Sequence, residues 1–230
     1  MTGKQALRIL VTGGTRGIGA AICDELAEHE IYVGGRDAQQ VQQRCAQLPH
    51  AHPFVCDLED PESIAAACAA VEKLDVLVLN AGMALSGTVE EVSHADWQRI
   101  LTVNVIAQAD LLRALLPKLR LKNGLVVAIN SGAGYHSGAG GAAYSASKFA
   151  LRALTDALRE EERGRVRVCS VHPGRVDTDM QVELQTNAGR AYRAGDHMPV
   201  QAIAQAVRAA LEMPENAVVE TISVRPVTQM

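Results

Sequence analysis

Short runs of apolar residues alternate along the chain with longer stretches in which apolar residues recur every three or four positions. The short runs predict β-strands and the longer stretches predict helices. We expect strands over Leu7–Val11, Ile31–Val33, Phe54–Cys56, Val76–Leu79, Leu125–Ile129, Val166–Val171 and Val218–Val224. The expected helices are Gly17–His29, Ala38–Leu48, Pro61–Val71, Ala95–Leu119, Ala142–Arg163 and Val200–Leu211.

Strands that alternate with helices are typical of α/β proteins, whose parallel strands are apolar because both of their faces are buried. Right-handed crossovers then favour a Rossmann-type, doubly wound, seven-stranded parallel sheet with helices on both faces. No repeat or linker interrupts the pattern, so residues 1–230 are predicted to form a single domain. Residues 176–198 lack a clear period and are expected to be irregular. This stretch follows a strand's carboxyl end, which makes it a candidate substrate lid, or else a plain surface connection.

Composition narrows the class of protein. A net charge of −4, with lysines and arginines scattered, argues against nucleic-acid binding. Five cysteines without a C-x-x-C pair indicate reduced thiols, and His50 and His52 lack the further ligands of a metal site. Residues 1–10 lack the apolar core of a signal peptide, and no apolar stretch approaches the roughly 20 residues of a membrane span. We expect a cytoplasmic protein with a small-molecule substrate and no metal, membrane or nucleic-acid partner.

A glycine-rich loop joins the first predicted strand to the first predicted helix. Its sequence is Thr12-Gly13-Gly14-Thr15-Arg16-Gly17-Ile18-Gly19. Glycines let the backbone turn sharply and approach a pyrophosphate, which the N-terminus of the following helix stabilises. The position of the loop between a strand and a helix makes it a candidate dinucleotide site.

The end of the second strand indicates which nucleotide binds. NAD sites usually carry an acidic residue there, which would repel the 2′-phosphate of NADP. Here the strand ends in Gly34-Gly35-Arg36, and Arg16 in the loop can reach the same region. Two guanidinium groups suit a phosphate, so NADP(H) is the expected cofactor. NAD(H) is the alternative, if both arginines face solvent and Asp37 binds the ribose.

The strongest chemical signal lies between residues 131 and 148. Tyr144 and Lys148 are four residues apart at the start of a predicted helix, so they lie on one face. A free tyrosine has a pKa of about 10, and a neighbouring ammonium would favour its phenolate. Tyr144 is therefore a candidate general acid–base, and Lys148 could also bind the cofactor's ribose. Ser131, just after the strand Leu125–Ile129, could stabilise charge on the reacting oxygen.

These motifs together are similar to those of the short-chain dehydrogenase/reductase family, in its single-domain, NADP(H)-preferring branch. Thr12–Gly19 matches the family's TGxxxGxG, Tyr144 and Lys148 match its Tyr-x-x-x-Lys, and Ser131 precedes Tyr144 by the usual interval. The resemblance implies an oxidoreductase, an NADP-dependent enzyme acting on CH–OH or C=O groups. It also implies that the catalytic residues are Ser131, Tyr144, Lys148 and Asn104, the last completing a proton relay through a water.

The same resemblance assigns the cofactor contacts. Asp57-Leu58 corresponds to the adenine contact, Asn80-Ala81-Gly82 to the family's NAG motif, and Pro173-Gly174 with Thr178 to the nicotinamide contact. The implied cofactor-binding residues are Gly13, Thr15, Arg16, Gly17, Ile18, Gly19, Arg36, Asp57, Leu58, Asn80, Ala81, Gly82, Tyr144, Lys148, Pro173, Gly174, Val176 and Thr178. The segment 225–229 is similar to that of some 3-hydroxy-acid and serine dehydrogenases of the family, which is a hint about the substrate.

The helix that carries the catalytic pair also predicts assembly. Its outer stripe consists of Ala146, Ala150, Ala153 and Ala157. The preceding helix is broadly apolar over Ile100, Val103, Ala107, Leu111, Leu112, Leu115 and Leu116. Both helices are expected to pair with their symmetry mates in a homodimer or homotetramer, as is common in the family. The alternative is that alanine is simply a good helix former.

Two other functions share some of these motifs. A non-catalytic NADPH-binding sensor or scaffold of the same fold would typically lack the tyrosine or the lysine, yet both are present. An epimerase or dehydratase that uses the same tyrosine usually has a different glycine spacing and a sizeable C-terminal substrate domain.

Overall fold

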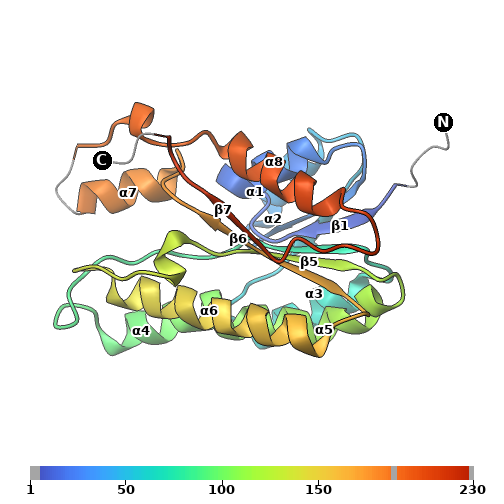
Figure 1. The fold of residues 1–230 in the computed structure, drawn as a ribbon, viewed down its shortest axis with the longest axis horizontal. Coiled ribbons are helices and arrows are strands. Elements are labelled where there is room, and N and C mark those ends of the chain that lie inside the picture. Colours follow the sequence, from blue (N-terminus) through green and yellow to red (C-terminus); the bar gives the residue numbers. More distant parts are fainter. Residues whose placement is uncertain (1–5, 188–190, 228–230) are drawn as a thin grey trace.

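The seven predicted strands form one parallel sheet in the computed structural model, which describes residues 6–187 and 191–227. The strands are β1 (Arg8–Val11), β2 (Glu30–Gly35), β3 (Ala51–Val55), β4 (Val76–Leu79), β5 (Leu125–Ile129), β6 (Arg167–Pro173) and β7 (Thr221–Val224). Their spatial order is β3-β2-β1-β4-β5-β6-β7, and every neighbouring pair is parallel. The doubly wound α/β fold is confirmed (Figure 1).

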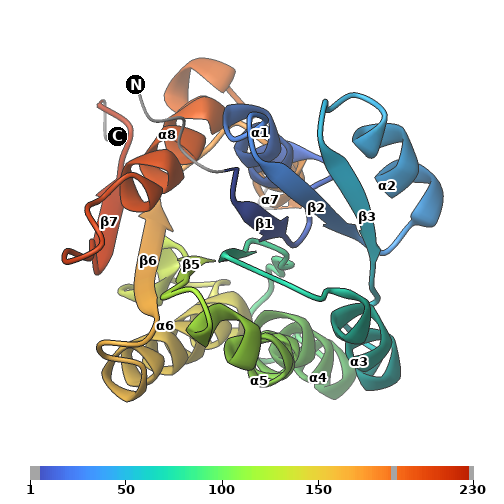
Figure 2. The ribbon, with the colours of Figure 1, turned by 90° about the vertical axis from the view of Figure 1, so that its right-hand side faces the viewer.

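Helices cover both faces of this sheet. They are α1 (Gly17–Glu25), α2 (Ala38–Cys45), α3 (Pro61–Ala70), α4 (His94–Leu101), α5 (Ala107–Arg120), α6 (Ala142–Glu161), α7 (Asp179–Asn187) and α8 (Val200–Leu211). Figure 2 shows α1, α2 and α8 on one side of the sheet and α3 to α6 on the other. Side chains of Asp37, Asp60 and Ser93 accept hydrogen bonds from backbone N–H groups and so cap α2, α3 and α4.

Two hydrophobic cores lie between the sheet and these two helix layers. In β1, Ile9 and Val11 point to the core beneath α1 and α8, whereas Leu10 points to the core beneath α3 and α5. All residues of β4 and β5 are buried, as expected for central strands covered on both faces. The apolar sequence of these two strands therefore follows from burial on both sides.

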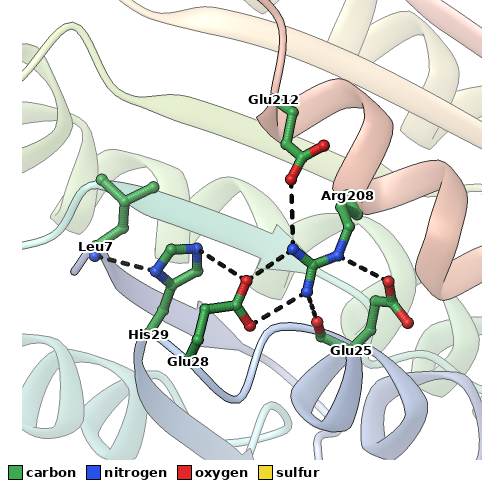
Figure 3. A network of polar contacts seen from close by, with 6 residues as sticks. All are labelled: Leu7, Glu25, Glu28, His29, Arg208 and Glu212. Carbon is green, nitrogen blue, oxygen red and sulfur yellow. Dashed lines mark hydrogen bonds and ion pairs between the residues drawn. The ribbon is translucent and has the colours of Figure 1, made fainter. Parts of the chain in front are cut away.

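An ionic cluster joins α1 to α8 (Figure 3). The Arg208 guanidinium lies 2.7 Å from a carboxylate oxygen of Glu25 and 2.7 Å from one of Glu28, and 3.4 Å from Glu212. It also donates to the backbone carbonyl of Glu25. His29 extends the cluster, since its Nδ1 accepts from the Leu7 N–H at 3.4 Å. One side chain of α8 thereby holds the carboxyl end of α1.

The long helix predicted over 95–119 is interrupted. Residues Thr102–Ile106 between α4 and α5 form a π-helical turn, in which one extra residue widens the helix. Sequence analysis also found no apolar stretch long enough to span a membrane, yet His94–Arg120 meets that criterion by length and composition. This finding is weak evidence for a span, because the core helix of a water-soluble protein meets the same criterion. Leu111, Leu115 and Leu119 of this segment are buried in the core beneath the sheet.

The segment 176–198 contains more regular structure than its sequence predicts. It includes α7, and Val176 forms a parallel bridge with Met198. The Asp177 N–H donates to the Met198 carbonyl at 2.8 Å, and the Met198 N–H donates to the Arg175 carbonyl at 2.9 Å. This bridge joins the two ends of the segment, which are far apart in sequence, so no local sequence pattern predicts it. Residues 188–190 of the candidate lid lie outside the described residues.

Candidate functional site

A cleft opens at the carboxyl ends of β1, β2 and β4. Its volume is about 280 Å³. Predicted cofactor residues that line it are Gly13, Arg16, Arg36, Asp57, Leu58, Ala81 and Gly82. It is also lined by Thr12, Gly34, Gly35, Phe54, Cys56, Glu59, Met83, Arg99 and Val103, to which the sequence analysis assigned no cofactor contact. The other predicted cofactor residues lie in adjoining segments and not on this surface.

The glycine-rich loop has the backbone that its sequence predicts. Gly13 and Gly17 have φ angles of +63° and +56°, which favour glycine. A Cβ at Gly19 would lie 2.1 Å from the Gly13 carbonyl oxygen, so only glycine fits there. In the described part of the chain no side chain caps the N-terminus of α1, because its N-cap residue, Arg16, makes no capping bond. The first N–H groups of α1 are therefore free of side-chain acceptors, as a phosphate site requires.

Hydrogen bonds attach the Asn80-Ala81-Gly82 segment to this loop. The Thr12 hydroxyl accepts from the backbone N–H groups of Asn80 and Ala81, each at 3.0 Å. The Asn80 amide in turn donates to the carbonyls of Thr12 at 2.9 Å and Gly13 at 3.1 Å. The ends of β1 and β4 are thus fastened together beneath the cleft. Thr12 was matched as part of the loop motif, but this linking role depends on the pairing of the two strands.

The two arginines predicted for the nucleotide line the same cleft, and each meets a carboxylate. Arg36 lies 3.7 Å from Glu59, and Arg16 lies 3.1 Å from Asp179 at the start of α7. Arg99 of α4 also contacts both carboxylate oxygens of Glu59, at 3.0 to 3.1 Å. Sequence analysis missed Glu59 and Arg99. Only the position of Glu59, two residues after Asp57, hinted at its place in the cleft.

The carboxylate of Asp37 is already engaged. It accepts from the backbone N–H groups of Gln39 and Gln40 at 2.9 and 3.1 Å, and so caps α2. The alternative in which Asp37 binds the ribose of NAD would compete with this cap. This geometry therefore favours the arginines over Asp37 as the groups that select the nucleotide.

Ser131, Tyr144 and Lys148 come together where β5 ends and α6 begins. The Ser131 hydroxyl accepts from the Ala133 N–H at 3.1 Å, and it is close enough to the Tyr144 hydroxyl to lower the pKa of that group. The Lys148 ammonium donates to the Ile129 carbonyl at 3.1 Å and lies 5.9 Å from the centre of the Tyr144 ring. Two of these residues share the first turns of one helix, and the third follows the neighbouring strand.

Burial controls the protonation of these groups. It raises the pKa of the Tyr144 hydroxyl, while the hydrogen bond from Ser131 opposes that rise. Burial also lowers the pKa of Lys148 to about 8. The sequence analysis expected Lys148 to lower the pKa of Tyr144. In the structure the ammonium is directed to the Ile129 carbonyl, and desolvation outweighs the other effects on the tyrosine.

Asn104 lies in the π-helical turn and is buried. Its Oδ1 accepts from the Met83 N–H at 2.8 Å, and its Nδ2 donates to the Met83 carbonyl and to Ser147 Oγ, both at 2.9 Å. A Cβ at Gly82 would lie 3.1 Å from Asn104 Oδ1 and 3.8 Å from Lys148 Nζ. Gly82 thus leaves room for Asn104 and Lys148 to approach from the same side.

The segment after β6 returns to the glycine-rich loop. Thr178 lies against Gly17, since its Cγ2 would be 3.7 Å from a Cβ there. Val176 is buried, and Gly174 lies between the end of β6 and the chain after β7. The predicted contacts after β6 therefore face the same end of the sheet as the loop. In the part of the chain that the structure describes, no group of three or more His, Cys, Asp or Glu could hold a metal ion.

Comparisons with known proteins match this geometry. A family model described as short chain dehydrogenase matches residues 8–189. The chain is 28% identical over 234 residues to a serine 3-dehydrogenase of Agrobacterium fabrum, which covers 96% of this chain and 94% of that protein. It superimposes with a TM-score of 0.89 and 26% identity on an alcohol dehydrogenase of the archaeon Thermococcus sibiricus complexed with 5-hydroxy-NADP, covering 98% and 99% of the two chains. A closed form of serine dehydrogenase complexed with NADP⁺ gives a TM-score of 0.88 at 26% identity, with 97% and 96% covered.

Proposed function

Because the chain belongs to the short-chain dehydrogenase family, we propose that it is an NADP(H)-dependent oxidoreductase that interconverts a carbonyl and an alcohol. The observation that carries this proposal is that Ser131, Tyr144 and Lys148 come together beside Gly82 of the nucleotide cleft. The non-catalytic sensor is the second candidate. It is disfavoured because both the tyrosine and the lysine are present in the arrangement that chemistry would need.

The cofactor assignment rests on the fit of the cleft's residues. The uncapped N-terminus of α1 and Gly19, where a side chain would clash, suit a pyrophosphate. Arg36 and Arg16 suit a 2′-phosphate, and Asp37 is engaged in capping α2. Two structural relatives are complexed with NADP⁺ or 5-hydroxy-NADP, which supports the same choice. When bound, the nicotinamide supplies or accepts the hydride.

The residues then divide the chemistry. In the reducing direction Tyr144 gives its hydroxyl proton to the carbonyl oxygen as charge develops there. Ser131 donates a hydrogen bond to the same oxygen and lowers the energy of that charge. Burial raises the pKa of the Tyr144 hydroxyl, so the hydroxyl holds its proton at neutral pH, and Ser131 partly opposes this rise. Lys148 would bind the ribose, and Asn104 would complete the proton relay through a water, as the resemblance to the family implies.

Substrate class is the finer proposal. Serine dehydrogenases stand among the relatives both by sequence and by structure. We therefore place 3-hydroxy acids and their 3-oxo counterparts first among the substrates to be tested. Residues 176–198 would cover the substrate, and the contact of Arg16 with Asp179 would connect that cover to the nucleotide site.

A turnover screen tests the function. Purified protein is mixed with NADPH and, in turn, with ketones, aldehydes, quinones and 3-oxo acids, and the loss of absorbance at the reduced nicotinamide band is followed. We expect turnover with at least one class, and no turnover by the Tyr144→Phe variant on that compound. Tight NADPH binding without turnover on any compound would support the sensor instead.

We also propose a homodimer or homotetramer. Ala146, Ala153 and Ala157 of α6 are exposed, as is Ile106 in the π-helical turn before α5. Most of the apolar residues predicted to extend this face are instead part of the chain's own core: Ile100, Ala107, Leu111, Leu112 and Leu115 are buried. The interface would thus rest mainly on α6. Light scattering after gel filtration should give a mass above 24.5 kDa, and Ala153→Arg should reduce it to that of the single chain.

A further inference from the structure

The loop that carries Ser131 is held from behind by one imidazole. His172, in β6, is fully buried. Its Nδ1 lies 3.1 Å from the Ser131 carbonyl oxygen, and its Nε2 lies 3.4 Å from the Tyr135 hydroxyl. The two ring nitrogens therefore meet the first and the last residue of the short loop 131–135.

The partners determine the tautomer of this ring. A carbonyl oxygen can only accept, so Nδ1 carries the hydrogen and donates it to Ser131. Nε2 is then the acceptor, and the Tyr135 hydroxyl donates to it. Burial, with the nearby guanidinium groups of Arg225 and Arg152, lowers the pKa of His172, which agrees with a neutral ring.

The loop itself is a tight turn. The Gly134 N–H donates to the Ser131 carbonyl at 3.0 Å, and the Tyr135 N–H donates to the Gly132 carbonyl at 3.0 Å. The Tyr135 ring packs on the imidazole at 4.5 Å between centres, and the Arg152 guanidinium covers the tyrosine at 4.6 Å. Tyr135 thus packs between the imidazole and Arg152 of α6, although 36% of its surface remains exposed.

The chain after β7 closes this arrangement from the other side. Arg225 donates to the His172 carbonyl, and its guanidinium would lie 3.4 Å from a Cβ at Gly132. Its Cδ would lie 3.1 Å from a Cβ at Gly174. Arg225 therefore fills the space between the loop after β5 and the end of β6, which continues into Pro173 and Gly174.

Other polar side chains on this face of the sheet lack such contacts. Ser170 is two residues before His172 in β6, and Asn130 precedes Ser131. Among the described residues, neither the Ser170 hydroxyl nor the Asn130 amide has a hydrogen-bond partner. His172 is distinguished from these neighbours because both of its ring nitrogens contact the Ser131 loop. Its role is therefore connected to that loop in particular, and not to a general polar network.

We propose that His172 is a positioning residue for the proposed reaction: it holds Ser131, through its carbonyl and through Tyr135, at a set distance from Tyr144 and from the Pro173-Gly174 segment. The proposal rests on the proposed function of Ser131. Rotation of the loop would move the Ser131 hydroxyl from the reacting oxygen without disturbing the nucleotide's phosphate end. Loss of the imidazole should therefore lower kcat and leave NADPH affinity in place.

Three substitutions test this role. His172→Leu removes both ring hydrogen bonds, whereas His172→Asn places an amide N–H where Nδ1–H was and keeps the donor to Ser131. Tyr135→Phe removes only the second bond. Ser170→Ala is the matched control, because Ser170 lies on the same strand and face, and its hydroxyl has no hydrogen-bond partner among the described residues. Turnover is measured on the best carbonyl substrate of the screen and expressed per NADPH-binding site, so that misfolded protein does not count.

We expect His172→Leu to lower kcat by roughly 10- to 100-fold with the NADPH Kd within about twofold of the parent, as for other misplaced catalytic groups. His172→Asn should recover most of that loss, Tyr135→Phe should lower kcat by only about threefold, and Ser170→Ala should change nothing. A His172→Leu variant as active as the parent, or an Asn variant no better than Leu, overturns the proposal. If His172→Leu does not fold, His172→Asn and Tyr135→Phe test the proposal instead. The proposal is overturned if any fall in their kcat is matched by a fall in melting temperature, since loss of folded structure then explains both.

Amide hydrogen exchange separates this inference from the proposed function. In the protein without cofactor, the peptide that contains Gly134 and Tyr135 should exchange faster in His172→Leu than in the parent, and Ser170→Ala should match the parent. Unchanged exchange shows that the imidazole does not hold the loop. One further outcome is a rise in exchange while neither the parent nor any variant turns over a carbonyl. In that case the proposed function is wrong and His172 still restrains the loop, but the restraint has no role in catalysis.

Discussion

The ionic cluster between α1 and α8 and the group of Ser131, Tyr144 and Lys148 differ in how they accommodate a positive charge. Arg208 meets the carboxylates of Glu25, Glu28 and Glu212, and its pKa is raised by these partners, first of all by Glu28 (Figure 3). Lys148, by contrast, is buried with no carboxylate partner among the described residues, and its pKa is lowered to about 8.

The difference teaches where the chain gives up stability for chemistry. A cation with acidic partners is held in its charged form, and partly exposed pairs of this kind add modest stability. When a cation is buried against a carbonyl alone, its neutral form is favoured and its pKa falls. Groups with shifted pKa values of this kind are typical of functional sites. Mutation of the Arg208 cluster should therefore change mainly the stability of the fold. Mutation of the Tyr144–Lys148 pair should change mainly the activity.

The largest effect is expected from Tyr144→Phe. This change removes one hydroxyl and should lower kcat by about a hundredfold or more, the range for a lost general acid. The NADPH Kd and the melting temperature should stay near those of the parent. Steady-state kinetics with a fluorescence titration of NADPH measure both quantities. Retained turnover would mean that another residue donates the proton.

Lys148→Met should make the cofactor-free protein more stable. Between pH 8 and 10.5 the folded parent carries a neutral Lys148 while the unfolded chain is protonated, so unfolding takes up a proton. The parent's free energy of unfolding therefore rises with pH in this window, and below pH 8 the destabilisation by the buried cation is complete. A shift of this size corresponds to an upper value of roughly 3 kcal/mol.

Denaturant unfolding at several pH values measures this effect. The variant should be more stable than the parent by about 1 to 3 kcal/mol at pH 7, and the gap should close as the pH rises from 8 to 10.5. Turnover and NADPH binding should both fall, because one ammonium serves both roles. A gap that does not change with pH would contradict the assigned cause.

Arg36→Ala tests the nucleotide end of the cleft. The parent should bind NADPH at least tenfold tighter than NADH, a difference of about 1.4 kcal/mol, and the variant should lose most of it. Arg113→Ala is the control, since Arg113 lies on α5, is 82% exposed in its side chain and pairs only with Asp110 among the described residues. Equal affinities in the parent would implicate Asp37 in ribose binding after all.

The smallest effect is expected from Arg208→Met. Removing the guanidinium leaves three carboxylates without their cation, but the cluster is partly exposed and screened, so a loss of about 1 kcal/mol is expected. That loss corresponds to a fall of about 2 to 4 °C in melting temperature for a chain of this size. Turnover per NADPH site should not change, and 1 M salt should reduce the difference. A loss of turnover would connect this face to the cleft.

Local patterns predicted most of the fold. Apolar runs marked all seven strands, with β4 and β5 at the predicted bounds, because buried strands need apolar residues on both faces. A single helix was predicted over 95–119, because its apolar residues recur regularly. This spacing does not reveal the extra residue of the π-helical turn. α7 was missed because its segment is closed by the pairing of Val176 with Met198, twenty-two residues along the chain.

The sequence by itself determined the chemistry-bearing motifs: the glycine-rich loop, Arg36 at the end of β2, and the Ser131, Tyr144 and Lys148 set. Each depends on backbone conformation or helical spacing over a few residues, so its signal is local. Only the tertiary structure decided that Arg99 meets Glu59 and that His172 meets Ser131, 41 residues away in sequence. Such contacts arise because β5 and β6 end side by side and because helices from distant segments reach the same cleft. No period or spacing along the chain encodes which strand ends become neighbours in space.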